Sequence, residues 1–76
     1  MEITGPQIRA ARSLLGWNAA HLAKLAGVSP ATVQRTEAGE SKRPVKAVRD
    51  ALVAALEAAG VEFIEGGARL KPGASK

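Results

Sequence analysis

The chain contains no cysteine and a single histidine among its 76 residues. Disulfides, cysteine-ligated metals and a thiol nucleophile are therefore excluded, and one histidine cannot build a multi-histidine metal site. We expect neither a metal nor another cofactor. No apolar run is long enough to span a bilayer, and the first residues lack the pattern of a signal peptide. We therefore expect a cytoplasmic protein that has no membrane partner.

Aromatic side chains are also scarce, because Trp17 and Phe63 are the only two and tyrosine is absent. Platforms that stack single strands or RNA loops need several exposed rings, so this mode of binding is disfavoured. His21 has no residue at nucleophile spacing around it, and the chain has no phosphate-binding glycine loop. The sequence therefore does not predict an enzyme.

Basic residues outnumber acidic ones, with 11 Lys and Arg against 7 Asp and Glu and a formal net charge of +4. This balance favours polyanionic partners such as nucleic acid, although many small proteins share it. A chain of this length makes at most one domain and buries only about 60% of its unfolded surface. Oligomerisation is a common way to stabilise such a domain.

Capping signals predict a first helix that opens at Thr4 and ends at Gly16. Gln7 stands three residues after Thr4, the spacing of a capping box. The side chains expected to face inward from this helix are Ile8, Ala11, Leu14 and Leu15.

Three further helices are predicted by the same kind of signal. Asn18 caps a second helix that runs to about Ala26. Gly27 can take the left-handed conformation that ends a helix, and Ser29-Pro30 then begins a third helix that ends near Gly39. A fourth helix begins at Pro44 and closes at Gly60.

The period of apolar residues changes after Gly60. Two strands of a β-hairpin are predicted there, in residues 61–65 and 68–71. Gly66-Gly67 suits a two-residue loop that needs positive φ. This register places Phe63 opposite Leu70 and Glu62 opposite Lys71, both favourable cross-strand pairs. Residues 72–76 are predicted to be a disordered tail.

The segment from Leu22 to Gly39 resembles the helix-turn-helix of the phage repressor and Cro type, the XRE family. The matching positions are Ala23, Gly27-Val28-Ser29, Thr32-Val33, and Glu37 with Gly39. The pattern extends to Arg12 and Leu15-Gly16-Trp17-Asn18 before the segment and to Lys42-Arg43-Pro44 after it, and covers roughly Ile8 to Leu56. The resemblance implies a mainly α fold, with a four-helix, lambda repressor-like DNA-binding domain in residues 1–60. The C-terminal β-hairpin predicted in 61–71 follows this domain.

The resemblance also implies that helix 30–38 lies in the DNA major groove. The residues that would then read bases are Pro30, Ala31, Gln34 and Arg35. Arg35 can bind guanine O6 and N7 together, and Gln34 can read adenine or touch a phosphate. The alternative is that Gln34 and Arg35 form a solvated helix face.

Phosphate contacts are expected from Asn18, Ser29, Thr32, Lys42 and Arg43. Asn18 and Ser29 stand at helix N-termini, whose N–H groups favour anions. In the resembling repressors, the residues at the positions of Asn18, Thr32 and the Lys-Arg pair contact phosphates of the DNA backbone. The alternatives are capping alone for Asn18 and Ser29, and a solvated loop for Lys42 and Arg43.

Arg12 and Glu37 resemble a structural ion pair of such repressors that ties the first helix to the end of the third. Ala19, Thr36 and Val45 depart from the family pattern. Ala19 replaces a glutamine that contacts phosphate, and Val45 stands where related repressors carry a minor-groove arginine. Thr36 replaces a large apolar residue, whose space Trp17 could fill.

The function that follows is a sequence-specific regulator of transcription, a repressor, that binds double-stranded DNA. It would act as a homodimer on an inverted repeat in a bacterial or phage setting, on the nucleoid when bound. The predicted dimer contacts are Phe63, Ile64 and Leu70 of the hairpin, with the fourth helix as the rival interface. The alternative is an antitoxin or adaptor of the same fold, which binds a toxin-like or other protein partner.

Overall fold

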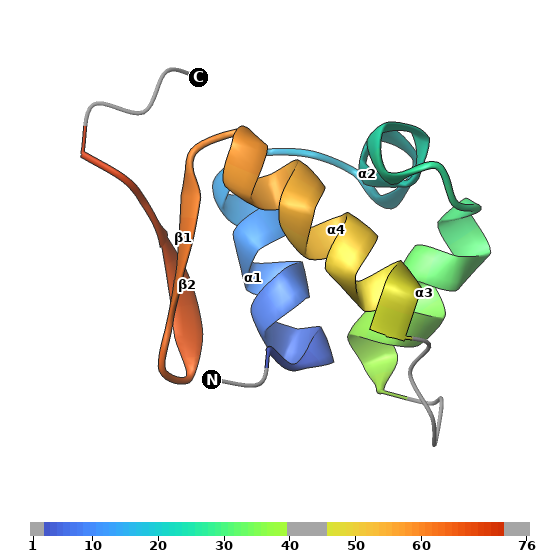
Figure 1. The fold of residues 1–76 in the computed structure, drawn as a ribbon, viewed down its shortest axis with the longest axis horizontal. Coiled ribbons are helices and arrows are strands. Elements are labelled where there is room, and N and C mark those ends of the chain that lie inside the picture. Colours follow the sequence, from blue (N-terminus) through green and yellow to red (C-terminus); the bar gives the residue numbers. More distant parts are fainter. Residues whose placement is uncertain (1–2, 40–45, 73–76) are drawn as a thin grey trace.

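The computed structural model describes residues 3–39 and 46–72 of the chain. Its elements are α1 (Gly5–Leu14), α2 (Ala19–Ala26), α3 (Pro30–Ala38), α4 (Lys46–Ala58), β1 (Val61–Ile64) and β2 (Gly67–Leu70). Figure 1 shows α2 and α3 at one end of the molecule and the hairpin at the other, with α1 and α4 between them. The predicted mainly α architecture with a C-terminal antiparallel hairpin is confirmed.

The helix ends follow the local capping chemistry. Thr4, Asn18 and Ser29 are N-caps, and each side chain accepts a hydrogen bond from the backbone N–H three residues further on. Gly27 and Gly39 adopt left-handed conformations, with φ of 76° and 69°, which end α2 and α3. These ends agree with the predicted ones. The predicted start of the fourth helix at Pro44 lies outside the described residues.

A single apolar core draws on all four helices and on β1. Its buried members are Ile8, Ala11, Leu22, Ala23, Val33, Leu52, Leu56, Val61 and Phe63. The prediction that Leu14 faces inward is wrong, because this residue is 43% exposed. Leu15 is the partly buried residue that packs against the core from this end of α1.

The predicted register of the hairpin is wrong by two residues. Phe63 pairs with Ala68 and Glu62 with Arg69, so the loop is formed by 65–66 instead of 66–67. Gly66 has φ of 76°, and no residue other than glycine has positive φ in the described ranges. The ion pair across the strands is therefore Glu62 to Arg69, with 2.7 Å between Arg69 Nε and Glu62 Oε1.

The hairpin shares the core of the helices. Val61 is fully buried and Phe63 is 8% exposed, and β2 lies against α1. Lys71 N donates to Gly60 O at 2.8 Å and closes the open end of the hairpin onto the end of α4. In the described ranges, no helix is long and apolar enough to cross a membrane.

Candidate nucleic-acid interface

One side of α3 faces solvent along its whole length. Pro30, Ala31, Gln34 and Arg35 are all exposed, whereas Val33 is fully buried. At about 100° per residue, these four exposed positions form one continuous side of the helix. The structure therefore brings together the four residues predicted to read bases.

The chemistry of this side is polar at one end and apolar at the other. Arg35 and Gln34 supply guanidinium and amide groups, and Pro30 and Ala31 supply small apolar surface at the start of the helix. Within 3–39 and 46–72, no acidic side chain pairs with Arg35. Its guanidinium can therefore bind an external acceptor without breaking an ion pair to any of these residues.

The predicted phosphate contacts lie at the beginnings of α2 and α3. Asn18 Oδ1 accepts from His21 N at 2.7 Å, which leaves the amide N–H₂ of Asn18 as a donor to solvent. Ser29 Oγ accepts from Thr32 N at 3.2 Å, and the two hydroxyl oxygens lie 2.8 Å apart. One of these hydroxyls donates to the other, so one hydroxyl hydrogen is left for an external acceptor.

Helix N-termini carry unpaired N–H groups and a positive dipole end, both of which attract anions. The caps and the donors left over at α2 and α3 are therefore compatible with phosphate binding. Lys42 and Arg43, the other predicted phosphate contacts, lie outside the described residues.

An ion pair fixes α3 to α1. Arg12 Nε and Nη2 lie 2.7 Å and 3.0 Å from the two carboxylate oxygens of Glu37, and Arg12 Nη1 donates to Trp17 O at 2.9 Å. The side chains are only 18% and 6% exposed. The hydrogen bond to Glu37 raises the pKa of Arg12 above its ordinary value, so the guanidinium stays charged.

Thr36, one of the departures from the family pattern, is half-buried in α3. Its hydroxyl donates to Thr32 O at 2.8 Å, one turn earlier in α3. This hydrogen bond satisfies a half-buried polar side chain within its own helix.

Two contacts near the start of α1 were not predicted from the sequence. A Cβ atom placed at Gly5 would lie 2.3 Å from Thr36 O and 2.6 Å from Glu37 O, so α1 touches the end of α3 through backbone alone. Gln7 is 4% exposed and donates to backbone carbonyls of the hairpin. A glycine inside a first helical turn was the only sequence signal of this close approach.

The three residues predicted to form the dimer do not share one environment. Phe63 lies in the core of its own chain at 8% exposed, and it offers little surface to a partner. Ile64 is 42% exposed and Leu70 is partly buried against the core. Of the three, Ile64 has the most surface available for another chain.

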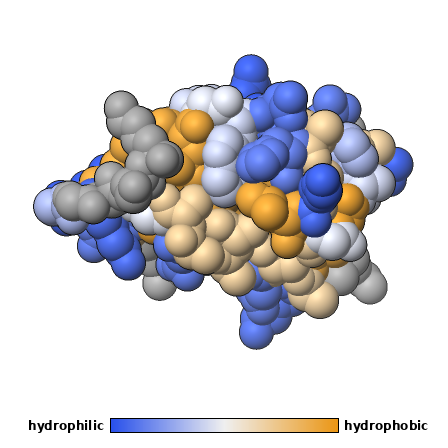
Figure 2. Space-filling view, turned by 90° about the horizontal axis from the view of Figure 1, so that it is seen from above, coloured by the Kyte–Doolittle hydropathy of each residue, from blue (hydrophilic) through white to orange (hydrophobic). Residues whose placement is uncertain are grey.

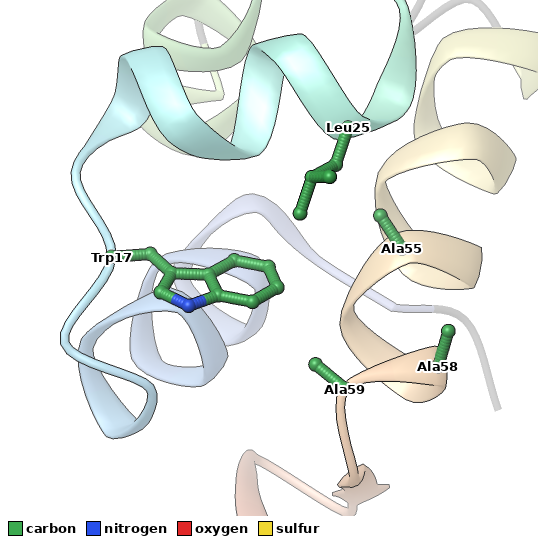
Figure 3. A pocket seen from close by; sticks show the side chains of 5 residues that line it. All are labelled: Trp17, Leu25, Ala55, Ala58 and Ala59. Atoms are coloured by element: carbon green, nitrogen blue, oxygen red, sulfur yellow. The ribbon is translucent and has the colours of Figure 1, made fainter. Parts of the chain in front are cut away.

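An open apolar cavity of about 370 Å³ lies between α2 and α4 (Figure 3). Its lining residues are Trp17, Leu25, Ala55, Ala58 and Ala59, and none of them is titratable. Figure 2 views the side where α2 and the end of α4 lie, and apolar residues form a band across it. Trp17 also contacts His21 edge to face, with ring centroids 4.7 Å apart. The cavity therefore offers apolar surface and no acid, base or nucleophile.

The described part of the chain contains no cluster of three or more His, Cys, Asp or Glu side chains that could hold a metal ion.

In comparisons with known proteins, a family model described as a helix-turn-helix domain matches residues 5–63. This match begins with α1 and reaches into β1. No curated protein and no solved structure shows detectable similarity to the chain.

Proposed function

Because this chain belongs to the helix-turn-helix domain family, whose members bind DNA, we propose that it is a sequence-specific regulator of transcription of the phage repressor and Cro type. In this proposal α3 lies in the major groove of double-stranded DNA. The protein acts as a repressor, as a homodimer on an inverted-repeat operator. It works in the cytoplasm of a bacterial cell, on the nucleoid when bound.

The observation that carries the proposal is the continuous exposed side of α3. Gln34 and Arg35 are polar, exposed and next to one another, while Val33 anchors the opposite side in the core. Arginine binds guanine O6 and N7 in a bidentate manner, which is the commonest specific contact in the major groove. A helix held rigidly from behind presents these groups in a fixed geometry.

Positioning on the duplex would come from the helix N-termini. Asn18 at α2 and Ser29 with Thr32 at α3 retain donors that suit phosphate oxygens. Contacts of this kind set the register of the helix on the DNA but carry no sequence information. They should make binding fall steeply as salt rises.

A dimer is proposed because one recognition helix reads too few base pairs for useful specificity. Two-fold symmetry doubles the site and spaces the half-sites about one helical turn apart. Among residues 3–39 and 46–72 the sheet has two strands, so its outer edges are open to pairing with a second copy. Ile64 would lie in such an interface, because it is an exposed apolar side chain beside the loop.

The dimer interface is tested best with a point variant, since deletion of the hairpin would also remove Val61 and Phe63 from the core. Sedimentation across a range of protein concentrations should show a dimer for the unchanged chain and a monomer for Ile64→Lys. Leu25→Lys is the matched control, because Leu25 is similarly exposed but lies on α2. If only the Leu25 variant dissociates, the interface lies on the helices.

The DNA-reading role is tested with Arg35→Ala on a duplex chosen by the unchanged protein. We expect affinity to fall by about 5- to 150-fold, the value of one bidentate base contact. Arg9→Ala is the control, since Arg9 is an exposed arginine of α1 and its loss removes the same charge. Equal losses from both variants would show that α3 contributes only charge, and would contradict the proposal.

A further inference from the structure

The first turn of α1 lies between the hairpin and the end of α3. On the hairpin side, Gln7 Nε2 donates to Ile64 O at 2.7 Å and to Gly67 O at 3.1 Å. Ile64 and Gly67 are the paired residues that close the hairpin loop. One buried amide therefore holds both strands at the loop end of the hairpin.

The other end of the same amide belongs to the helix cap. Gln7 Oε1 accepts from Thr4 N at 2.9 Å and from Thr4 Oγ1 at 3.3 Å. Both amide hydrogens and both acceptor positions of Gln7 are therefore used. Since the residue is 4% exposed, water cannot easily replace any of these partners.

The opposite side of this turn is pressed against α3. Gly5 leaves no space for a Cβ atom beside Thr36 O and Glu37 O, which are backbone atoms of the last turn of α3. Because there is no room for even a methyl group between Gly5 and these backbone carbonyls, α1 and α3 can slide little past one another here. A rigid path therefore runs from the hairpin loop through one helical turn to α3.

Apolar packing alone would not fix the angle of the hairpin. Val61 lies in the core at the open end and Phe63 one pair before the loop, whereas Ile64 beside the loop is 42% exposed. Apolar contacts are non-directional, and an isolated two-stranded hairpin is only marginally stable in water. The hydrogen bonds of Gln7 add directional contacts at the loop end.

We propose that Gln7 is a positioning residue that fixes the hairpin relative to α3 and so sets the spacing of the two recognition helices in a dimer. The part that concerns spacing rests on the proposed function, because it requires DNA binding by a dimer joined through the hairpin. The orientation of the hairpin relative to α3 within one chain does not depend on the proposed function.

Two variants separate the hairpin contact from the helix cap. Gln7→Glu keeps an oxygen for the Thr4 backbone N–H and removes both donors to the hairpin. Thr4→Ala removes the side-chain cap and keeps both donors. We expect both variants to be less stable than the unchanged protein. If Gln7 only stabilised the fold, neither variant would change the distance between the hairpin and α3 in the folded state.

The first measurement is the distribution of distances between spin labels at Glu65→Cys and Ala38→Cys. The chain has no native cysteine, and both positions are exposed, at the hairpin loop and at the end of α3. We expect Gln7→Glu to broaden or shift the distribution and Thr4→Ala to leave it unchanged. Equal distributions in folded Gln7→Glu and in the unchanged protein would overturn the proposal. Should Gln7→Glu not fold, Gln7→Met removes the same donors without adding a charge.

The second measurement uses duplexes with the selected inverted repeat, with the same half-sites moved one base pair apart, and with one half-site. Gln7→Glu should reduce the preference for the selected spacing by about tenfold and leave half-site affinity unchanged. Full retention of the preference would overturn the role in spacing. If the unchanged protein binds no DNA, the proposed function fails, and the spin-label distances still decide the role of Gln7 within the chain.

Discussion

The ion pair between Arg12 and Glu37 allows a quantitative test of how α3 is held. Arg12→Ala leaves a carboxylate that is only 6% exposed without its cationic partner. Breaking such a buried pair from one side costs about 3–5 kcal/mol. Glu37→Ala leaves a guanidinium that is 18% exposed and still donates to Trp17 O, so we expect a smaller loss of about 2–3 kcal/mol.

The double variant should be more stable than the sum of the two losses implies. Once both charges are gone, no uncompensated buried charge remains, and we expect a coupling free energy of about 2–3 kcal/mol. A domain of this size has a total stability of about 4–11 kcal/mol, so each single change is a large fraction of it. Urea unfolding of the four proteins gives the cycle, and trimethylamine N-oxide can stabilise the weakest variants for the measurement.

The pH dependence of this coupling has a definite sign. The pKa of Arg12 is raised in the folded protein. The stability that the charged guanidinium contributes is therefore fully present below the pKa of Arg12 in the unfolded chain, and it is lost only as pH rises through the pKa in the folded protein. The coupling should therefore be the same at about pH 7 and about pH 9.5. Losses that add within about 0.5 kcal/mol would refute the account of Arg12 and Glu37 as a shielded pair.

Three further changes probe other parts of the fold. Gly27→Ala should lower the free energy of unfolding by about 1–2 kcal/mol, because Gly27 has a φ of 76°. Gly27→Asn should lower it less, since asparagine tolerates this conformation, and thermal unfolding measures both losses. Gly5→Ala and Gly5→Asn should both destabilise the fold by about 1–3 kcal/mol or more, because the added Cβ atom meets backbone carbonyls of α3, and an undiminished melting temperature would contradict that contact. Glu62→Gln should change the free energy of unfolding by less than about 0.5 kcal/mol, since the side chains of Arg69 and Glu62 are 58% and 41% exposed, and a larger loss would show that the pair is shielded.

The helices could be predicted from the sequence because their ends are decided locally. Thr4, Asn18 and Ser29 each cap the N–H three residues on, and a cap of this kind needs no distant partner. Gly27 and Gly39 likewise end helices through their own conformational freedom. The four base-reading candidates followed from the resemblance, and all four lie on the exposed side of α3 while Val33 is buried.

The hairpin register could not be predicted in this way. A shift of two residues leaves every side chain on the same face, so alternation of apolar and polar residues does not distinguish the two registers. Two consecutive glycines allow either loop. The observed register is the one in which Gln7 reaches the carbonyls of Ile64 and Gly67, and this contact spans 57 and 60 residues of sequence.

The burial of Phe63 and the exposure of Leu14 also depended on tertiary structure. Phe63 is apolar and stands in a short strand, which is equally compatible with a dimer contact and with a core position. The packing of the hairpin on α1 places it in the core. Leu14 lies at the margin of the helical stripe, where the neighbouring elements decide which leucine is covered, and they cover Leu15.

Selection from a random duplex library tests the central claim most directly. The unchanged protein and Arg35→Ala should be selected in parallel, at low and at moderate salt. We predict that the unchanged protein enriches an inverted repeat, and that Arg35→Ala loses the preference for one guanine in each half-site. Enrichment of the same motif by both proteins, or of none, would contradict the claim that α3 reads DNA sequence through Arg35.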